Sequence, residues 1–362
     1  MIPVCDLHVD TVLEIQGGAD LHAGNPQGHV DIPRMRRGGA GLLVFACFVP
    51  SVLPVGRAFR EATALLDKID RTCSRFADDL VKVETAADAE AARAGGKIGI
   101  LPAIENGHAI ESDLGRLERL RRRGVRYMTL THSRHLEWAA SSGQAWSGTS
   151  GLGALGRDVV REMESLGILV DVSHVHESTF WDVIRVARKP VIASHSCASA
   201  LCPLARNLTD DQIRAVAASG GMVGVNFFPG FLDPGYFAGQ EATLEALFAD
   251  LERIELEHAD DPGRKIAETH RSAALARERQ GPARADAAMV AAHMRHVVEL
   301  VGDDHVGFGS DFDGVPVLPH DVPDCAAYPH VLARLAEEGF GEHQARKIAW
   351  GNFLRVLGES DR

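Results

Sequence analysis

Eight short runs of apolar residues recur along the chain, separated by longer segments whose apolar positions follow a helical period. Each run is too short for a helix, and several are rich in valine, isoleucine and leucine, as is typical of buried parallel strands. The pattern therefore predicts eight strands, at Val4–Val9, Gly41–Phe48, Ile98–Ile104, Tyr127–Thr131, Ile168–Val172, Val191–Ala193, Met222–Val225 and Val306–Gly309.

Helical patterns fill most of the gaps between these strands. Asp113–Arg123 begins with an acid and ends with bases, which matches the helix dipole, and Thr209–Ser219 begins with an N-capping cluster. The other helical segments are Arg57–Ala77, Gly156–Leu166 and Glu177–Arg188. Because strands and helices alternate throughout, we predict an α/β fold, specifically a (β/α)8 TIM barrel. A doubly wound open sheet is the competing architecture.

The gap between the seventh and eighth predicted strands is about 80 residues long. It holds a helical segment, Glu241–Glu257, and a charged stretch, Arg264–Arg284, with few large apolar residues. Because this region lacks a core of its own, we expect a single barrel domain over residues 1–362. Its helical insertion, at about 229–290, would serve as a lid or a subunit contact, and the chain would end in a helical tail at Gly341–Leu357.

Side chains that bind metal ions follow most of the predicted strands. In a barrel the carboxyl ends of the strands meet at one face, where active sites lie. Ligand types therefore arrive together from several strands, and this coincidence predicts a metal site. The side chains at this face are His8, Asp10, Glu105, His132, His174, His195, Asn226 and Asp311.

Taken alone, most of these residues have a structural explanation. His8 and Asp10 lie two positions apart, so both side chains leave a strand in the same direction and can hold one metal ion. A core histidine beside a turn aspartate has the same spacing. His174 and His195 each close an apolar run, where a core histidine is the commoner occupant. A carboxylate at the position of Glu105, after a buried strand, is costly unless it is paired, and a bridge between two metal ions would offset that cost.

Composition restricts the possible partners. The chain has 362 residues and a net charge of −12, which argues against nucleic acid because phosphate binding needs a basic face. No apolar stretch approaches about 18 residues, and the first residues, MIPVCDLHVD, lack the pattern of a signal peptide. We therefore expect no membrane span and a cytoplasmic location. The six scattered cysteines lack CxxC spacing and are expected to be reduced and mostly buried.

Seven short motifs occur in order along the chain: DLHVDT, ENG, LTH, DVSH, SHS, ARN and GSDFDG. Together they resemble the membrane (renal) dipeptidase family, a branch of the amidohydrolase superfamily, and the resemblance extends from Asp6 to the GNFLRVL segment at Gly351–Leu357. It implies a (β/α)8 barrel with a binuclear zinc site that cleaves dipeptides, including those with a C-terminal D-residue.

The resemblance also implies which residues hold the metal ions. Two Zn2+ ions per chain would be bridged by Glu105 and a hydroxide. His8 and Asp10 would bind the first ion, and His174 and His195 the second.

Four further residues receive roles in the reaction from the same resemblance. Asp311 would contact the bridging hydroxide and shuttle its proton, and His132 would polarise the scissile carbonyl. Arg206, in CPLARN, would hold the substrate's terminal carboxylate, which suits a bidentate guanidinium, and Asn226 would also contact the substrate. Without the resemblance, a core histidine and a surface arginine would be the favoured interpretations of His132 and Arg206.

One segment departs from the family pattern. The family usually has an Asn and then Trp-Ala-Asp shortly after LTH, whereas this chain has SRHLEWAASS at Ser133–Ser142, with Ala140 in place of the acid. This loop lies near the substrate's amino end. Either Glu137 replaces the missing acid, or the basic residues Arg134 and His135 favour an acidic or acylated substrate.

The predicted function is therefore a zinc-dependent dipeptidase with a small dipeptide substrate. The alternative is an amidohydrolase that acts on N-acyl amino acids, lactams or lactones at the same binuclear site. A barrel that binds metal without catalysis is a third interpretation, and a homodimer is left open.

Overall fold

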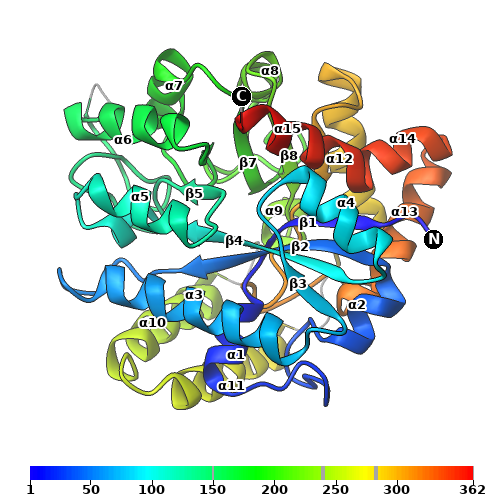
Figure 1. Cartoon of the computed structure of the whole chain (residues 1–362), viewed down its shortest axis with the longest axis horizontal. Coiled ribbons are helices and arrows are strands. Elements are labelled where there is room, and N and C mark those ends of the chain that lie inside the picture. The colour runs from blue at the N-terminus through cyan, green and yellow to red at the C-terminus, as the bar shows by residue number, and fades with distance from the viewer. Residues whose placement is uncertain (149–150, 238–240, 281–283, 362) are drawn as a thin grey trace.

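The computed structural model describes residues 1–148, 151–237, 241–280 and 284–361 (Figure 1). The strands are β1 Val4–Val9, β2 Ala40–Phe48, β3 Leu80–Lys82, β4 Ile98–Glu105, β5 Tyr127–Thr129, β6 Leu169–Asp171, β7 Val191–Ser196, β8 Met222–Val225 and β9 Val306–Phe308. The α-helices are α1 Thr11–Gly17, α2 Ile32–Gly38, α3 Ala58–Arg75, α4 Ala86–Ala94, α5 Gly115–Arg122, α6 Ala154–Ser165, α7 Glu177–Val186, α8 Asp210–Ala218, α9 Pro229–Leu232, α10 Glu241–Glu257, α11 Pro262–Gln280, α12 Ala287–Val301, α13 Tyr328–Glu337, α14 Glu342–Arg346 and α15 Asn352–Ser360. Short 3-10 turns lie at Gly107–Ile110 and Cys325–Ala327, and a π-helical turn lies at Lys347–Gly351.

Eight of the strands close into a parallel barrel. They pair in the order β2, β1, β9, β8, β7, β6, β5, β4, and β2 also pairs with β4, which closes the ring. The register places Phe48, at the end of β2, opposite Glu105 at the end of β4. The predicted (β/α)8 barrel is confirmed. The open sheet is wrong, because an open sheet would leave two of these strands with an unpaired edge.

One strand of the sheet, β3, lies outside the barrel ring and is not among the strands that the sequence pattern predicts. It pairs with the first half of β4, where Leu80 faces Ile98, whereas β5 pairs with the second half, where Thr129 faces Glu105. β3 has three residues and includes a lysine, so it produces no apolar run. It lengthens the sheet at one edge without entering the barrel ring.

The long connection between β8 and β9 contains α9, α10, α11 and α12. α12 packs against α8 and α13, as a barrel helix does, so the added elements are α9, α10 and α11. α11 lies against both α1 and α10 (Figure 1). Two parts of the predicted insertion at about 229–290, residues 238–240 and 281–283, lie outside the described residues.

The C-terminal helix α15 covers the amino end of the barrel. Asn352 Nδ2 donates to Val306 O at the start of β9 (2.8 Å), and Lys189 Nζ, just before β7, donates to Ser360 O (2.9 Å). Phe353 and Leu357 pack with buried strand residues in one apolar cluster. The opposite, carboxyl end of the barrel is therefore the end that carries the site.

Two expectations from composition concern the chain as a whole. All six cysteines are buried and none forms a disulfide, as predicted. Within the described part of the chain, every helix is too short or too polar to span a bilayer.

Arg126, at the start of β5, is fully buried and joins three parts of the chain. Its Nε donates to Gly167 O (3.2 Å), one η nitrogen donates to Ser360 Oγ (2.9 Å), and the other donates to Glu84 O. Arg126 therefore fastens α15 to the barrel wall.

We expect Arg126→Met to lower the free energy of unfolding by about 2–4 kcal/mol, because it leaves buried acceptors without their donor. Urea unfolding followed by circular dichroism measures this loss. The control is Arg122→Met, since the Arg122 side chain is 70% exposed and, among the residues that the structure describes, forms an ion pair with Glu118 alone. A surface pair of this kind contributes within about 0.5 kcal/mol. Equal effects of the two substitutions would refute the fastening role of Arg126.

Candidate metal centre

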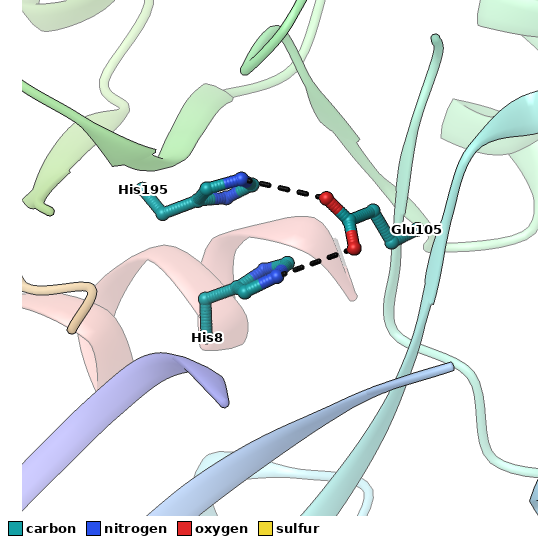
Figure 2. A group of neighbouring side chains, drawn as sticks. All are labelled: His8, Glu105 and His195. Atoms are coloured by element: carbon teal, nitrogen blue, oxygen red, sulfur yellow. Dashed lines mark ion pairs between the residues drawn. The ribbon is translucent and has the colours of Figure 1, made fainter. Parts of the chain in front are cut away.

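Imidazole and carboxylate groups from five elements meet at the carboxyl end of the barrel. β1, β4 and β7 carry His8, Glu105 and His195, and the loops after β5 and β6 carry His132 and His174. Figure 2 shows the rings of His8 and His195 stacked one above the other, with the Glu105 carboxylate facing the edges of both rings. The centroids of these two rings are 3.7 Å apart. The convergence of these side chains is thus a property of the fold.

The Glu105 carboxylate is the centre of the cluster. Its Oε1 lies 3.2 Å from His174 Nε2, 3.5 Å from His195 Nε2 and 3.8 Å from His132 Nε2. Its Oε2 lies 3.6 Å from His8 Nε2 (Figure 2). Each oxygen therefore faces a different set of imidazole nitrogens, as a carboxylate that bridges two cations does.

Three overlapping groups of ligand atoms surround this carboxylate, and the atoms within each group lie within 4.8 Å of one another. Glu105 belongs to two of the groups, and His8 also belongs to two. The groups are His8, Glu105 and His195; Glu105, His132 and His174; and His8, Asp10 and Asp311. The geometry thus offers adjacent cation sites that share a ligand, and it brings His132 and Asp311 into the same cluster as the five ligands that the family resemblance implies.

The hydrogen bonds of His8 fix which ring nitrogen faces the cluster. Tyr127 Oη donates to Leu7 O (2.9 Å), so it accepts from His8 Nδ1 at 2.8 Å. His8 Nε2 is buried and has no hydrogen-bond partner among the described residues. Burial lowers the pKa of His8, but Tyr127 and Glu105 outweigh it and raise that pKa well above its usual value. A divalent cation competes with the proton for this nitrogen.

A second hydrogen-bond chain fixes His195 in the same way. Ser194 Oγ donates to Asp171 Oδ2 (2.6 Å) and therefore accepts from His195 Nδ1 (2.7 Å), which leaves the lone pair of Nε2 facing Glu105. Asp171 also accepts from Thr129 Oγ1 (2.6 Å). Carboxylate–histidine chains of this kind orient metal ligands in proteins. Tyr127, Ser194 and Asp171 carry no signal in the sequence that marks them as site residues, because only the fold places them behind the ligands.

The electrostatics of the cluster suit cation binding. Burial opposes ionisation of Glu105, but the charge on His8 outweighs it and holds the pKa of this carboxyl well below its usual value. Burial, reinforced by Arg206, lowers the pKa of His174 well below its usual value, and burial together with His8 does the same for His195. The anionic carboxylate and the neutral imidazoles of His174 and His195 are the forms that bind metal ions, whereas His8, whose pKa is raised, has to lose its proton to bind one.

Strained backbone is concentrated at this end of the barrel. Asn106, His174, Asp311 and Asp313 adopt left-handed conformations, with φ of 85°, 65°, 63° and 67°. Such conformations cost non-glycine residues about 1–3 kcal/mol each, and they persist where surrounding structure imposes them. For His174, the contacts that hold this conformation include a hydrogen bond from Ser142 N to the His174 carbonyl oxygen (2.8 Å).

Asp311 is held by neighbours on two sides. Asn226 Nδ2 donates to Asp311 Oδ2 (2.8 Å), and Asn226 Oδ1 accepts from Phe228 N (2.6 Å). A Cβ atom on Gly314 would collide with Asp10 Oδ2 and Asp311 Oδ1, so glycine is required there. The substrate contact expected for Asn226 stays a prediction, and the structure places its amide against Asp311.

Arg206 lies beside the centre with donors to spare. Its two η nitrogens donate to Ser196 Oγ (2.7 Å) and to His195 O (2.8 Å). Its Nε is buried and lacks a hydrogen-bond partner among the described residues. Burial lowers the pKa of Arg206 from its usual value. A partly buried guanidinium with an unused donor can bind an anion.

In the loop at Ser133–Ser142, both basic side chains are already engaged. Arg134 pairs with Glu252 of α10, and His135 Nδ1 accepts from Ser141 N (2.9 Å). Glu137 is exposed, and Ala140 is buried. The structure therefore links this loop to the insertion, and the roles that the sequence suggested for its charged residues stay predictions.

Comparisons with known proteins identify the family and the fold. The model of the membrane dipeptidase family, peptidase family M19, matches residues 1–362. The chain is similar to a crystal structure named dipeptidase AC, a metallopeptidase of family M19, with 28% identity, a TM-score of 0.80, and coverage of 99% of this chain and 98% of that one. The chain is also similar to a metallopeptidase from Rhodobacter sphaeroides, liganded with a phosphinate mimic of the dipeptide L-Ala-D-Ala. The identity is 27% and the TM-score is 0.79, and the match covers 99% of each chain. For the probable dipeptidase PvdM from Pseudomonas aeruginosa, the identity is 25% and the TM-score is 0.81, and the match covers 99% of this chain and 95% of that one.

We expect His174→Ala to remove roughly one of two metal equivalents, because it deletes a ligand from one group and leaves the group of His8, Glu105 and His195 intact. Elemental analysis of the purified protein measures the ratio. His22→Ala, which removes an exposed imidazole, serves as the matched control. An unchanged metal content in His174→Ala would exclude this residue from the ligands.

Proposed function

The chain belongs to the membrane dipeptidase family of metallopeptidases, and we propose that it hydrolyses dipeptides at a centre of two zinc ions. The proposed ligands are His8, Asp10, Glu105, His174 and His195, with Glu105 and a hydroxide as the bridges.

The position of Glu105 is the observation that carries this proposal. Its two oxygens face separate imidazole sets, and the hydrogen bonds of His8 and His195 direct the Nε2 atoms toward it. Imidazole and carboxylate ligands suit Zn2+. Two bound zinc ions would lower the pKa of a shared water toward neutrality and polarise the substrate carbonyl.

The remaining residues act on protons and on the substrate. We assign proton transfer to Asp311: Asn226 occupies its Oδ2, and its Oδ1 lies close to Gly314 beside Asp10. Asp311 would accept the proton of the attacking water and pass it to the leaving amine. We assign polarisation of the substrate's scissile carbonyl to His132. Its side chain is 27% exposed, compared with 16% for His174, so it is the more accessible of the two to a substrate.

Arg206 supports a dipeptide rather than a longer peptide. Its guanidinium donates a hydrogen bond to the backbone carbonyl of His195, and His195 is a proposed metal ligand. An anion bound to Arg206 therefore lies next to the metal centre. A terminal carboxylate held there places the adjacent peptide bond at the centre. The dipeptide mimic in the Rhodobacter sphaeroides enzyme supports the proposal that C-terminal D-residues are accepted.

A second candidate function rests on the loop after β5. Ala140 is buried and supplies no carboxylate where the family usually has an acid, so a substrate with an acylated amino end fits this loop as well. N-acyl amino acids, lactams and lactones would use the same metals and the same Arg206.

We also propose a cytoplasmic location, which the six unpaired, buried cysteines support.

Replacing Asp311 with Asn should lower kcat by about 10²–10⁴-fold while leaving two zinc ions bound, because the amide keeps the shape of the side chain but cannot accept the proton. Steady-state kinetics and elemental analysis on one preparation test both parts. Asp78→Asn, at an exposed position, is the matched control. Full turnover in Asp311→Asn would rule out the proton-transfer role.

A substrate panel tests the proposed function itself. Zinc-loaded protein should hydrolyse L,L- and L,D-dipeptides, lose the activity with a chelator and regain it with Zn2+. N-acetylated versions of the same dipeptides distinguish the two candidate functions. Faster hydrolysis of the acetylated compounds would replace the dipeptidase with the second candidate.

A further inference from the structure

The segment after β8 forms an aromatic cluster beside the metal centre. Phe228 contacts Phe231 and Tyr236 edge-to-face, with ring centroids 5.0 Å and 5.4 Å apart, and Tyr236 contacts Phe237 at 5.4 Å. Val315, from the loop that carries Asp311, packs against the same cluster. Phe228 and Tyr236 are buried, whereas Phe231 and Phe237 remain partly exposed. The exposed rings can therefore contact a ligand.

Of the two partly exposed rings, Phe231 is the one that meets the substrate-binding arginine. The Arg206 guanidinium carbon lies 5.3 Å from the centroid of the Phe231 ring. The ring thus flanks the guanidinium, while the donors of the guanidinium remain at its edge. An anion held on that edge has Phe231 as its neighbour.

Two buried polar side chains hold Phe231 in this position. Asn207, next to Arg206 in sequence, donates from Nδ2 to Phe231 O (2.9 Å) and to Cys202 O (2.8 Å). His293, on α12, accepts from Ala198 N at Nδ1 (3.1 Å) and therefore donates from Nε2 to Leu232 O (3.2 Å). The backbone of α9 is thus tied to the loop that carries Arg206. The ring and the guanidinium form one preorganised surface.

The charges around this surface disfavour an acidic ligand side chain. Residues 226–237 read NFFPGFLDPGYF, and Asp233 is the one charged residue among them. Its carboxylate accepts from Gly235 N (2.8 Å) and lies 3.6 Å from Arg284 Nε. Arg284 is paired with Asp233 and Arg206 would hold the terminal carboxylate, so a second carboxylate beside the ring would lose hydration while neither of these cations is left to pair with it. An apolar side chain would gain buried contact.

We propose that Phe231 makes this enzyme selective for dipeptides whose C-terminal residue has an apolar side chain. The inference rests on the proposed function, because it takes Arg206 as the residue that holds the terminal carboxylate. The C-terminal side chain leaves the carbon atom that also carries this carboxylate, so it emerges beside the ring that flanks Arg206. Phe231 then determines specificity through contact with the substrate.

The test compares C-terminal Leu with C-terminal Glu behind the same N-terminal L-Ala, in both the L,L and the L,D series. Wild-type zinc-loaded protein should favour Leu in kcat/KM by about tenfold or more in the better-used series. Phe231→Ala should reduce this ratio about tenfold, and Phe231→Leu should preserve it, because leucine keeps an apolar contact. The control is Phe237→Ala, which deletes a ring of the same cluster that does not lie over Arg206.

The outcomes separate this inference from the proposed function. If the wild-type protein hydrolyses no dipeptide, the proposed function fails. If it hydrolyses both substrates at equal rates, or prefers Glu, the function stands and the selectivity is overturned, with no variant needed. An equal loss of preference in Phe231→Ala and Phe237→Ala would assign the selectivity to the cluster as a whole and remove it from Phe231.

Discussion

The buried carboxylate of Glu105 is the constraint around which the rest of the site is arranged. An ionised carboxyl group at the end of a fully buried strand is costly in free energy unless positive charge or hydrogen-bond donors surround it. Here four imidazole nitrogens lie within 3.8 Å of its two oxygens. The closed barrel makes this possible, because parallel strands that point the same way deliver their terminal side chains to one face.

The residues behind the ligands convert this cluster into an ordered metal centre. Tyr127 and Ser194 each accept a hydrogen bond from the outer nitrogen of an imidazole, and Asp171 orients Ser194, so the inner nitrogen of each ring faces Glu105. The left-handed turn at Asp311 brings its carboxylate close to Asp10, at a point where only a glycine fits at position 314. Local strain and glycine placement thus serve the geometry of the site at some cost to the stability of the loops.

The substrate side of the centre is assembled from more distant parts of the chain. Arg206 is bonded to the backbone of His195, so a bound anion and the metal ligands share one framework. The insertion contacts the rim of the barrel through several ion pairs, among them Arg134–Glu252, Arg57–Asp260 and His270 Nε2, which lies 2.9 Å from Glu14 Oε1 on α1. α1 begins directly after Asp10, so the insertion and the metal centre are connected through a short stretch of covalent chain.

The linear pattern of apolar and polar residues predicts the barrel and the types of residue at its active end. Its short apolar runs marked all eight strands of the ring, because buried parallel strands need continuous apolar side chains. The position of Glu105 after such a run pointed to a cation, because a buried charge requires a partner. The pattern does not predict β3, because three residues that include a lysine form no apolar run.

The orientation of these groups depends on contacts between residues that are distant in sequence. The proton positions on His8 and His195 depend on Tyr127, Leu7 and Asp171, and the last of these acts through Ser194. The contact of Phe231 with Arg206 depends on Asn207 and His293, residues separated by 86 positions in sequence. Hydrogen bonds and ring contacts form between neighbours in space, and a linear pattern of apolar and polar positions contains no record of which distant residues become neighbours.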